Sequence, residues 1–404
     1  MTEKSIPVGY KNSTVGIIPQ EWEVKRLGEI CTTFKSGNTI TSSDIDEKGV
    51  YPVYGGNGLR GYTHQYTHDG DYVLIGRQGA LCGNINYVNG KNYITEHAIA
   101  VQADRDNDLK YLAYKLYFWN LNRFSESSAQ PGLSVEKLVR YKLAVPPLAE
   151  QQKIAQILKL WDKAIEKQVQ LIKALEKRKQ ALMQRLLSGR TRLPGFTGEW
   201  KKEKLMDIGI FLSTNSFPRD KMNETEGTIM NVHYGDILIK YPTIVDLKTI
   251  NVPYLNNGIK VKSDLLKDGD VIIADTAEDK IVGKAIEIVN IGTHQIVSGL
   301  HTFAFRPNES LFVNRFLGYY LNSVGYRKQL ESLIQGIKVC SISKSSILNT
   351  YISIPLIKEQ QAIVNILVSA DDEIKRHNTK LSQLRKQKRG LMQQLLTGKK
   401  RVKE

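Results

Sequence analysis

The sequence contains only three cysteines, Cys31, Cys82 and Cys340, and no two of them form a CxxC pair. Their wide separation argues against a disulfide framework and against a zinc site, so we predict no bound metal. The chain also lacks any run of 18 apolar residues, which argues against a membrane-spanning helix. Its first residues lack the apolar stretch of a signal peptide. We therefore expect a cytoplasmic protein.

Motifs that carry catalysis are also missing, because the sequence has no HExxH, GxSxG or P-loop. Two segments imitate enzyme motifs. GNGLRG at 56–61 fits GxGxxG, but no helical period follows it, so a glycine-rich recognition loop is favoured over a nucleotide site. NVPY at 251–254 is similar to an adenine-methyltransferase tetrapeptide, but no glycine-rich cofactor loop accompanies it. We predict a non-catalytic protein without a cofactor, and keep a stand-alone adenine DNA methyltransferase as the alternative function.

The 404 residues are too many for one ordinary core and favour two domains. The formal charge is +16, and its distribution is uneven. Residues 150–192 and 358–404 each carry a net charge of +7, so 14 of the 16 charges lie in these two segments. Long solvated helices are often rich in lysine, which is one explanation. Contact with nucleic-acid phosphates is the other.

The two basic segments are copies of one another. When the sequence is shifted by 209 positions, residues 145–190 match residues 354–399 without a gap, and 18 of the 46 positions are identical. The shared residues include the pairs Glu150/Glu359, Gln151/Gln360, Asp162/Asp371, Met183/Met392 and Gly189/Gly398. Such a long match in one register indicates duplication of a larger unit.

Each copy is predicted to form one long helix. Pro146 and Pro355 stand just before the start, and Gly189 and Gly398 stand where a helix ends. Apolar residues recur at alternating steps of four and three, which is typical of a coiled-coil seam. The helix over 154–186 would be about 50 Å long. The predicted helix-pairing residues are Ile154, Leu158, Trp161, Ile165, Ile172, Leu175, Leu182, Leu186, Ile363, Leu367, Ile374, Leu381, Leu384, Leu391 and Leu395.

We expect these helices to pair with each other in an antiparallel direction. A parallel pair would stack Lys179 on Lys388, and the like charges would repel. The antiparallel pair sets Lys179 opposite the small Ala370 and Lys388 over Trp161, where a cation–π contact can form. His377 then lies in the seam, so we interpret it as a packing residue and not as a metal ligand.

A globular region of roughly 150 residues precedes each helix. Both regions open alike, with Trp22 and Trp200 in matching places, and both contain a strand-like run after a Gly-Asp turn and then a histidine, His97 or His301. Short strands rich in Tyr, Val and Ile predict α+β domains dominated by antiparallel sheet. The segments 51–70 and 241–261 show no match, so we expect one scaffold with two different sets of loops.

This combination of motifs resembles the DNA-specificity subunit of type I restriction–modification systems. The resemblance is carried by YPVYGGNG, GDYVLIGRQGALCG and TEHA in the first half, by the repeated EQQ and LMQ motifs of the helices, and by the duplication itself. It covers essentially the whole chain. It implies two target-recognition domains, 1–145 and 191–354, separated by antiparallel coiled-coil spacer helices at 146–190 and 355–404.

The resemblance also implies the partners. They are double-stranded DNA with a split target site, two methyltransferase (modification) subunits docked on the helices, and restriction motor–nuclease subunits, in a bacterial or archaeal cell. The subunit itself has no catalytic role in this family. One departure concerns Arg77, whose place in the second half is taken by Asp275 and Thr276. A phosphate contact by Arg77 therefore does not transfer to the second domain.

The candidates for DNA contact are polar and aromatic residues of the predicted loops. Arg can bind guanine, and Asn or Gln can bind adenine, in the major groove. For any single residue the alternative is ordinary: a tyrosine packs in or on a sheet, and a lysine is solvated. The predicted DNA-binding residues are Tyr54, Asn57, Arg60, Tyr62, Arg77 and Gln78 in the first half and Lys240, Tyr241, Lys260, Lys262 and Lys280 in the second.

Overall fold

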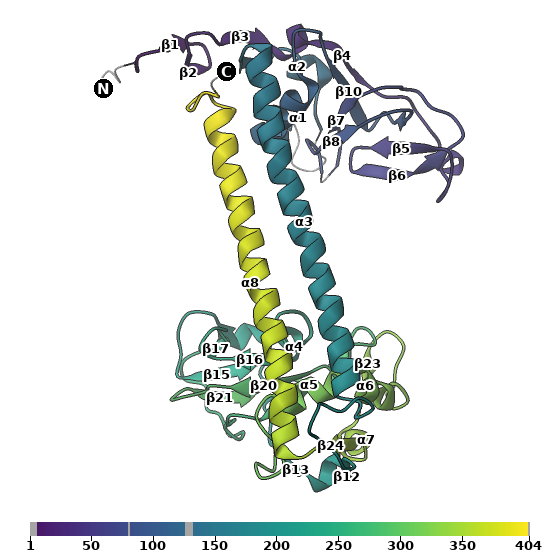
Figure 1. Cartoon of the computed structure of the whole chain (residues 1–404), viewed down its shortest axis with the longest axis vertical. Helices are drawn as coiled ribbons and strands as arrows, with labels where there is room; N and C mark the ends of the chain where they lie inside the picture. Colours follow the sequence, from purple (N-terminus) through teal and green to yellow (C-terminus); the bar gives the residue numbers. More distant parts are fainter. Residues whose placement is uncertain (1–5, 80, 126–131, 403–404) are drawn as a thin grey trace. The chain divides into compact units, whose positions relative to one another are not determined.

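The computed structural model describes residues 6–79, 81–125 and 132–402. Contacts divide the chain into two units, residues 1–170 with 378–404, and residues 171–377 (Figure 1). Each unit holds one globular domain and part of each of two long helices, α3 (Leu148–Leu186) and α8 (Ile357–Leu395). Within the described ranges, no helix is long and apolar enough to cross a membrane.

The first domain contains an antiparallel sheet of order β4-β10-β7-β8 and a smaller sheet of order β6-β5-β9, in which β5 and β9 are parallel. Short antiparallel pairs join β1 to β2 and β3 to β11. The elements are β1 (Tyr10–Ser13), β2 (Gly16–Pro19), β3 (Glu23–Arg26), η1 (Leu27–Ile30), β4 (Cys31–Ser36), η2 (Ser42–Asp44), β5 (Tyr51–Gly55), β6 (Gly58–Thr63), β7 (Tyr72–Gly76), β8 (Ile85–Val88), β9 (Tyr93–Ile94), β10 (Ala98–Ala103), α1 (Leu109–Trp119), η3 (Leu121–Phe124), α2 (Val135–Leu138) and β11 (Lys142–Val145).

Both faces of the four-stranded sheet are buried. Val73 and Ile75 of β7 pack in one cluster with Leu112 and Leu116 of α1, whereas Leu74 of β7 packs in another cluster with Tyr54 of β5. Asp108 caps α1 by accepting a hydrogen bond from the Tyr111 amide. The sheet therefore has a helix on one side and the smaller sheet on the other, which explains the continuous apolar run in β7.

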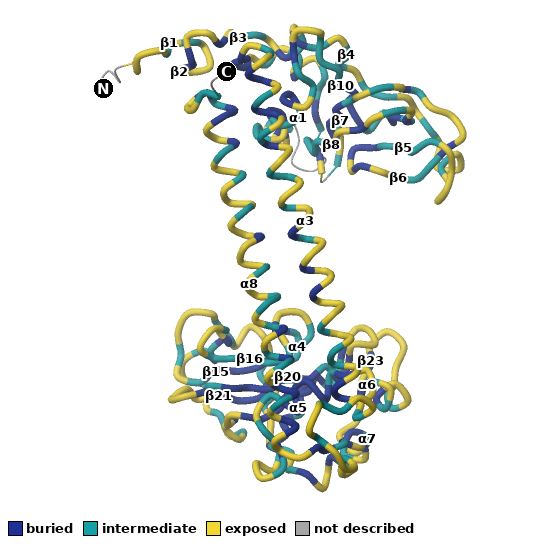
Figure 2. The backbone as a smooth tube through the Cα atoms, viewed as in Figure 1, coloured by how far each residue is buried: buried dark blue, intermediate teal, exposed yellow. Residues whose placement is uncertain are grey.

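The second domain has a sheet of order β13-β22-β18-β20-β16 and another of order β14-β17-β15-β21. Strands β18 and β20 are buried along their whole length (Figure 2). The elements are β12 (Lys201–Lys204), η4 (Leu205–Asp207), β13 (Gly209–Leu212), η5 (Arg219–Lys221), β14 (Met222–Asn223), β15 (Ile229–Val232), α4 (Tyr234–Ile239), β16 (Ile244–Asp246), β17 (Tyr254–Leu255), β18 (Val271–Ala274), β19 (Thr276–Ala277), β20 (Ala285–Val289), β21 (Gln295–Ser298), β22 (Thr302–Pro307), α5 (Phe316–Leu321), α6 (Val324–Glu331), β23 (Cys340–Ser341), α7 (Lys344–Leu348) and β24 (Tyr351–Ile354).

The second domain repeats the strand pairing of the first. Strands β13, β22, β18 and β20 pair as β4, β10, β7 and β8 do, and β24 pairs with β12 as β11 pairs with β3. The repeat extends into the segments that show no match in sequence, because β15 pairs parallel with β21 and antiparallel with β17, as β5 does with β9 and β6. The segments 51–70 and 241–261, which we expected to carry different loops, also contain strands: β5 and β6 in the first and β16 and β17 in the second. Backbone pairing is conserved there although the side chains differ.

The EQQ motif at the start of each long helix has a structural reason. Gln151 Nε2 donates a hydrogen bond to Pro146 O at 2.9 Å, and Gln360 Nε2 donates one to Pro355 O at 2.9 Å. Each glutamine also accepts a backbone N–H at the start of the domain's helix, from Asp108 in the first unit and from Val313 in the second. The amide of each glutamine thus fastens the long helix to the domain that precedes it.

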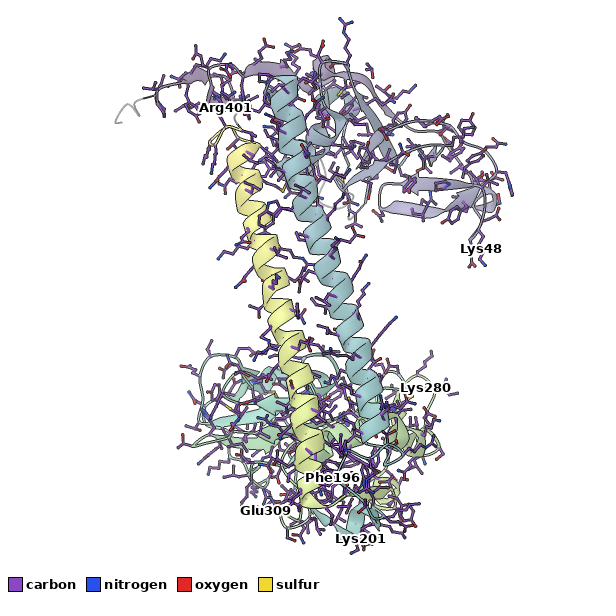
Figure 3. All side chains as sticks on the ribbon, viewed as in Figure 1. Lys48, Phe196, Lys201, Lys280, Glu309 and Arg401 are labelled. Atoms are coloured by element: carbon purple, nitrogen blue, oxygen red, sulfur yellow. The ribbon has the colours of Figure 1, made fainter. Side chains whose placement is uncertain are left out.

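The glutamate of the EQQ motif in α3, Glu150, lies in a buried charged cluster of the first unit. Glu150 accepts hydrogen bonds from Trp22 Nε1 at 2.9 Å and from Arg401 Nε at 2.8 Å. Arg401 lies beside the end of α8 (Figure 3). A Cβ on Gly398 would lie 2.6 Å from the Pro19 ring, so glycine is needed there, and its φ of 72° is left-handed. The chain that follows α8 is therefore built into the first domain.

The second unit contains the same cluster. Glu359 accepts hydrogen bonds from Trp200 Nε1 at 3.2 Å and from Arg192 Nε at 2.7 Å. Gly189, with a φ of 68°, packs on the Trp200 ring. In each unit the arginine follows one long helix and the glutamate begins the other. The arginine–glutamate contact therefore holds both long helices on each domain.

Within each unit the parts of α3 and α8 lie side by side and run antiparallel (Figure 1). In the first unit Lys388 Nζ lies 2.5 Å from Asp162 Oδ1. In the second unit Lys179 Nζ lies 2.5 Å from Asp371 Oδ1, and Arg178 pairs with Glu373. The residue numbers fall along α8 as they rise along α3, which is the antiparallel order.

The partners of the two seam lysines differ from those expected. Lys388 lies over the Tyr114 ring at 5.2 Å and not over Trp161. Lys179 lies over the Tyr319 ring at 5.4 Å and pairs with Asp371, the residue after Ala370. The reason is that Tyr114 and Tyr319 come from the globular domains, whose packing on the helices the sequence pattern does not reveal.

All fifteen predicted helix-pairing residues are buried or half-buried. Ile154 and Leu158 pack with Tyr111 of α1 in the first unit, and Ile363 and Leu367 pack with Phe316 in the second. The seam thus serves two purposes. Its middle faces the other long helix, and its ends complete the cores of the domains.

Candidate nucleic-acid interface

In the first domain the turn between β5 and β6 packs against the end of β7. A Cβ on Gly56 would lie 2.8 Å from His97 O, and one on Gly76 would lie 2.5 Å from Gly56 O. Only glycine permits two backbones to approach this closely. The contact sets the exposed Asn57 of the turn beside the segment that begins at Arg77.

A polar cluster forms around the end of β7. The Arg77 amide donates to His97 O at 2.9 Å, Gln78 Oε1 lies 3.3 Å from His97 Nδ1, and Glu96 Oε1 lies 3.2 Å from His97 Nε2. Together with Asn57, the cluster offers a guanidinium, two amides and an imidazole. These are the groups that bind guanine and adenine edges or phosphate. The structure thus brings three of the predicted residues, Asn57, Arg77 and Gln78, together.

The other predicted residues of the first half lie along the β5–β6 hairpin. Tyr54 packs on the buried cluster beneath β7, so its ring is mainly structural. Tyr62 is half-buried, and its backbone exchanges two hydrogen bonds of 2.8 Å with Asp46. Arg60 is exposed and lies where the pairing of the two strands shifts by one residue. Of these three, Arg60 has the side chain most accessible to a ligand.

In the second domain a cavity of about 630 Å³ lies beside the end of β18. It brings together Lys260 and Lys262 with Asp275, His301 and Lys344. Its other lining residues include the segment 211–217 and residues 300–303. Three lysines on one hollow make it suitable for an anionic ligand such as a DNA backbone.

The end of β18 is the counterpart of the end of β7. The Asp275 amide donates to His301 O at 3.1 Å, as the Arg77 amide does to His97 O. Asp275 Oδ1 lies 3.4 Å from His301 Nδ1, and His301 has a left-handed φ of 52°. At one place in the shared frame, the first domain therefore carries a guanidinium and the second a carboxylate. A carboxylate accepts from the cytosine amino group, whereas a guanidinium donates to guanine.

A further carboxylate, Asp264, and the His233 imidazole hold fixed positions near this cavity. The Ser213 hydroxyl and amide both donate to Asp264 Oδ2 at 2.7 Å and lower the pKa of that carboxyl. Burial and then the Arg219 guanidinium lower the pKa of His233, whose Nδ1 accepts the Gly235 amide at 3.2 Å. Through this hydrogen bond His233 caps α4.

The remaining predicted residues of the second half do not line this cavity. Tyr241 is 3% exposed and belongs to the hydrophobic core, so its prediction as a DNA contact was wrong. Tyr241 follows α4 and packs in the same cluster as Ile237 of that helix, so its ring points into the core. Lys240 is exposed and lies 3.3 Å from Glu224, and Lys280 is exposed in the loop after β19 (Figure 3).

Several residues at these places were not predicted from the sequence. They are His97, Asn215, Tyr234, His301 and Lys344; the Tyr234 and His301 rings lie 5.2 Å apart. The histidines carried a usable signal, because each follows a matching strand in its half. No sequence signal pointed to Asn215, Tyr234 and Lys344, because they reach the site from distant segments of the chain.

The two enzyme-like motifs lie in structures that differ from those of enzymes. Gly56, Gly58 and Gly61 belong to the β5–β6 hairpin, and no helix begins after them to hold a phosphate. In the NVPY segment Val252 is buried and Tyr254 is in β17. Among the described residues, no group of three or more His, Cys, Asp or Glu is placed to hold a metal ion.

The chain is similar to known proteins in both sequence and fold. Residues 19–177 and 198–386 match the family described as type I restriction modification DNA specificity domain. The type I restriction enzyme EcoprrI specificity subunit of Escherichia coli is 42% identical over 159 residues, or 38% of this chain and 39% of that protein. The MjaVIII specificity subunit of Methanocaldococcus jannaschii is 26% identical over 415 residues, or 96% of this chain and 94% of that protein.

Solved structures show the same fold. The S subunit of a type I restriction–modification system from M. genitalium matches with a TM-score of 0.57 at 15% identity, over 93% of this chain and 96% of that one. A chain from a study of the assembly and conformational transition of the type I R-M system matches with a TM-score of 0.59 at 18% identity, over 94% and 99%. At these identities the match concerns the fold.

Proposed function

The chain belongs to the family of type I restriction–modification DNA specificity proteins, and from this premise we propose how its two domains share the work. Each domain reads one half of a split DNA site. Residues 1–145 and 191–354 are the two target-recognition domains, and residues 146–190 and 355–404 are the spacer helices. The observation that carries this proposal is the exchange of Arg77 for Asp275 at one place in a repeated frame. The same scaffold then selects different bases in the two halves.

The long helices supply the second part of the proposal. Each is continuous over 39 residues and has residues in both units. An α-helix with a partner along its seam is stiff, so the pair can fix the distance between two half-sites. The exposed faces of the helices are the proposed docking surface for two methyltransferase subunits. Restriction motor–nuclease subunits then join the complex in the cytoplasm of a bacterium or archaeon.

The chain is proposed to recognise DNA without catalysing its modification. This is supported by its relatives, which are named specificity subunits of restriction enzymes. We expect no methyl transfer when the purified chain is mixed with S-adenosylmethionine and DNA. Methylated adenine should appear at one split site when the methyltransferase subunits are added. Methyl transfer by the chain alone would favour the alternative, a stand-alone methyltransferase.

Replacement of one side chain tests how the halves divide the target. Arg77→Ala should reduce methylation of the cognate site about 10–100-fold and relax the choice of base in one half only, because a good bidentate contact gives about 1–3 kcal/mol of discrimination. Sequencing of methylated adenines in DNA treated with the complex measures both effects. Arg105→Ala, at an arginine whose side chain is 92% exposed, is the control and should change neither. Loss of preference in both halves would contradict the assignment.

A further inference from the structure

The two domains differ at one edge of their main sheets. Strand β8 is the last strand of the first domain's sheet, and no described residue pairs with its outer side. In the second domain the corresponding strand β20 has a further neighbour, β16, which pairs with it in parallel. The correspondence follows from register, because Val73 lies opposite Tyr87 in one sheet and Val271 lies opposite Glu287 in the other.

The extra strand belongs to an insertion. Between β15 and β17 the second domain has residues 233–253, which include α4 and β16. Between the corresponding strands β5 and β6 the first domain has only Gly56 and Asn57. The link between β5 and β6 is thus too short to supply the segment that covers this edge in the second domain. An exposed strand edge presents unpaired N–H and C=O groups, and proteins usually cover it.

Strand β16 makes three contacts that define what fits this edge. Its preceding residue Thr243 accepts the Glu287 amide at 2.9 Å. Ile244 fills the space above α5, because a Cβ on Gly318 would lie 2.8 Å from Ile244 Cδ1. Asp246 follows Ile244 by two residues and therefore lies on the same face of the strand. Its carboxylate is 3.7 Å from the Arg315 guanidinium. This edge of the sheet therefore binds a strand through its backbone, through an aliphatic side chain against α5 and through a carboxylate beside Arg315.

The corresponding residues of the first domain surround a cavity. Tyr114 and Tyr319 donate to Asp162 and Asp371, which aligns α1 with α5. On that alignment Gly318 and Arg315 correspond to Ala113 and Lys110, and the strand register pairs Glu287 with Tyr87. Tyr87, Ala113 and Lys110 line a cavity of about 680 Å³. Its other lining residues are Asp71, Ile85, Asn89, Tyr114, Tyr117, Lys159, Asp162 and Lys388.

The surface of this cavity is suited to a protein partner. Tyr117 is 62% exposed and Tyr87 is 39% exposed, and exposed tyrosines are common in protein interfaces. Lys110 lies over the Tyr87 ring at 5.8 Å, and Lys159 adds a second exposed cation. Lys388 is already paired with Asp162. Asp71, the other carboxylate of the lining, accepts a hydrogen bond from Asn89 Nδ2. Because Lys110 and Lys159 outnumber it, the site keeps a net positive charge, which favours a carboxylate on the partner.

We propose that the open edge of β8 receives an extended strand from the methyltransferase subunit. The strand lies parallel to β8, places an aliphatic residue against Ala113, and places an Asp or Glu two residues later beside Lys110. This inference rests on the proposed function. The methyltransferase subunit is favoured because the same cavity is lined by Lys159 of α3 and Lys388 of α8, the helices proposed to dock it. DNA fits less well, since phosphates accept hydrogen bonds and cannot pair with the carbonyls of the edge.

Hydrogen exchange of the full chain tests the proposal. The register of β16 on β20 predicts that the Tyr87 amide, which faces outward, gains a hydrogen bond in the complex. Peptides covering 85–89 should exchange at least tenfold more slowly after the methyltransferase subunits are added, before any DNA is present. Protection that appears only when DNA is added would overturn the proposal and assign the edge to DNA.

Two substitutions give an independent test. Lys110→Glu reverses the charge expected to meet the partner's carboxylate, and Ala113→Phe fills the space expected to take its aliphatic residue. Each should weaken binding of the methyltransferase subunit at least tenfold in a titration. Lys142→Glu, at an exposed residue of β11, makes the same charge change away from the cavity and should leave binding unchanged. Circular dichroism of each variant establishes that it is folded.

The outcomes separate the two proposals. If the methyltransferase subunits do not bind the wild-type chain, the proposed function itself fails. If they bind, but the 85–89 amides stay unprotected and Lys110→Glu binds like wild type, only the proposed strand is wrong. If both protection and the substitution effects are found, a photo-crosslinker at position 87 should join a peptide of the methyltransferase subunit with an aliphatic residue two positions before an acidic one. A crosslinked peptide without this pattern would overturn the proposed contacts.

Discussion

Lys115 shows how a single buried charge links the first domain to the end of α8. Its side chain is 5% exposed, and Nζ donates to Leu396 O at 2.5 Å. It also lies 6.0 Å from the centre of the Trp22 ring. Burial lowers the pKa of Lys115 to about 8, because the ammonium loses its hydration. The neutral amine keeps its hydrogen bond to the carbonyl.

The lowered pKa predicts a pH dependence of stability. Between about pH 8 and pH 10.5 the unfolded chain holds the Lys115 proton and the folded chain has released it. Stability rises with pH wherever the unfolded state binds more protons, so this group contributes a rise on the order of 3 kcal/mol over that range. In Lys115→Met the contribution is absent. Urea unfolding of both proteins at pH 7.5 and pH 10 measures the difference.

A specific result would contradict this assignment. Other groups titrate at high pH, so the test is the difference between the two proteins and not the slope of either. If the free energies of unfolding of wild type and Lys115→Met change in parallel from pH 7.5 to pH 10, the lysine is not the group responsible.

At the scale of elements, the buried clusters at the helix starts explain how two long helices are held by small domains. Glu150 is 5% exposed and depends on Arg401 and Trp22 for its hydrogen bonds. The hydrogen bonds from Arg401 to Glu150 raise the pKa of the Arg401 guanidinium, and Glu21 is a second carboxylate partner of Arg401. The cluster couples the start of α3 to the chain after α8.

Arg401→Ala should therefore destabilise the first unit. Breaking a buried pair leaves a carboxylate without its counterion, which costs about 3–5 kcal/mol; we expect about 2–3 kcal/mol because Arg401 is partly exposed to water. Chemical unfolding followed by tryptophan fluorescence measures the loss. Arg105→Ala removes an exposed arginine 3.9 Å from Asp106 and should change stability by less than about 1 kcal/mol. If both variants lose the same free energy of unfolding, the buried cluster contributes no more to stability than an exposed ion pair.

At the scale of the whole molecule, the proposed spacing role can be tested by lengthening both helices. Seven residues inserted after Gln170 and seven inserted before Asn378 add one heptad to each helix and keep the seam in register. The addition lengthens each helix by about 10 Å. We expect the gap in the methylated site to grow by about three base pairs, at 3.4 Å for each.

The control for this experiment is an insertion that leaves the helices unchanged. Seven residues placed after Gly195 lengthen an open turn, where a Cβ would meet no atom within 4 Å. That protein should methylate a site with the original gap. An unchanged gap in the double-heptad protein would show that the helices do not set the spacing.

Much of the architecture was predictable because its signals are local. Pro146, Pro355 and the alternating apolar stripe predicted two long helices, and α3 and α8 have those bounds within a few residues. The like charges of Lys179 and Lys388 predicted the antiparallel direction. Helix ends and seam periods depend on residues only a few positions apart, so a sequence pattern determines them.

The site was predictable only in part. Asn57, Arg77 and Gln78 do gather at the end of β7, because Gly-rich turns there allow close approach of two backbones. Tyr241 does not, since the insertion that carries it folds into the core. Whether a loop tyrosine points out or in depends on what packs beside it.

The duplication, the helix pair and the two domains could be predicted from the amino-acid sequence, because they follow from repeated residues and periodicity along the chain. Folding was needed to learn which residues share a surface. Asp275 stands in the place of Arg77, Arg401 reaches Glu150, and no described strand pairs with β8 where β16 pairs with β20. The physical reason is that these contacts join segments far apart in sequence. Their formation depends on the packing of whole sheets and helices, which no local pattern encodes.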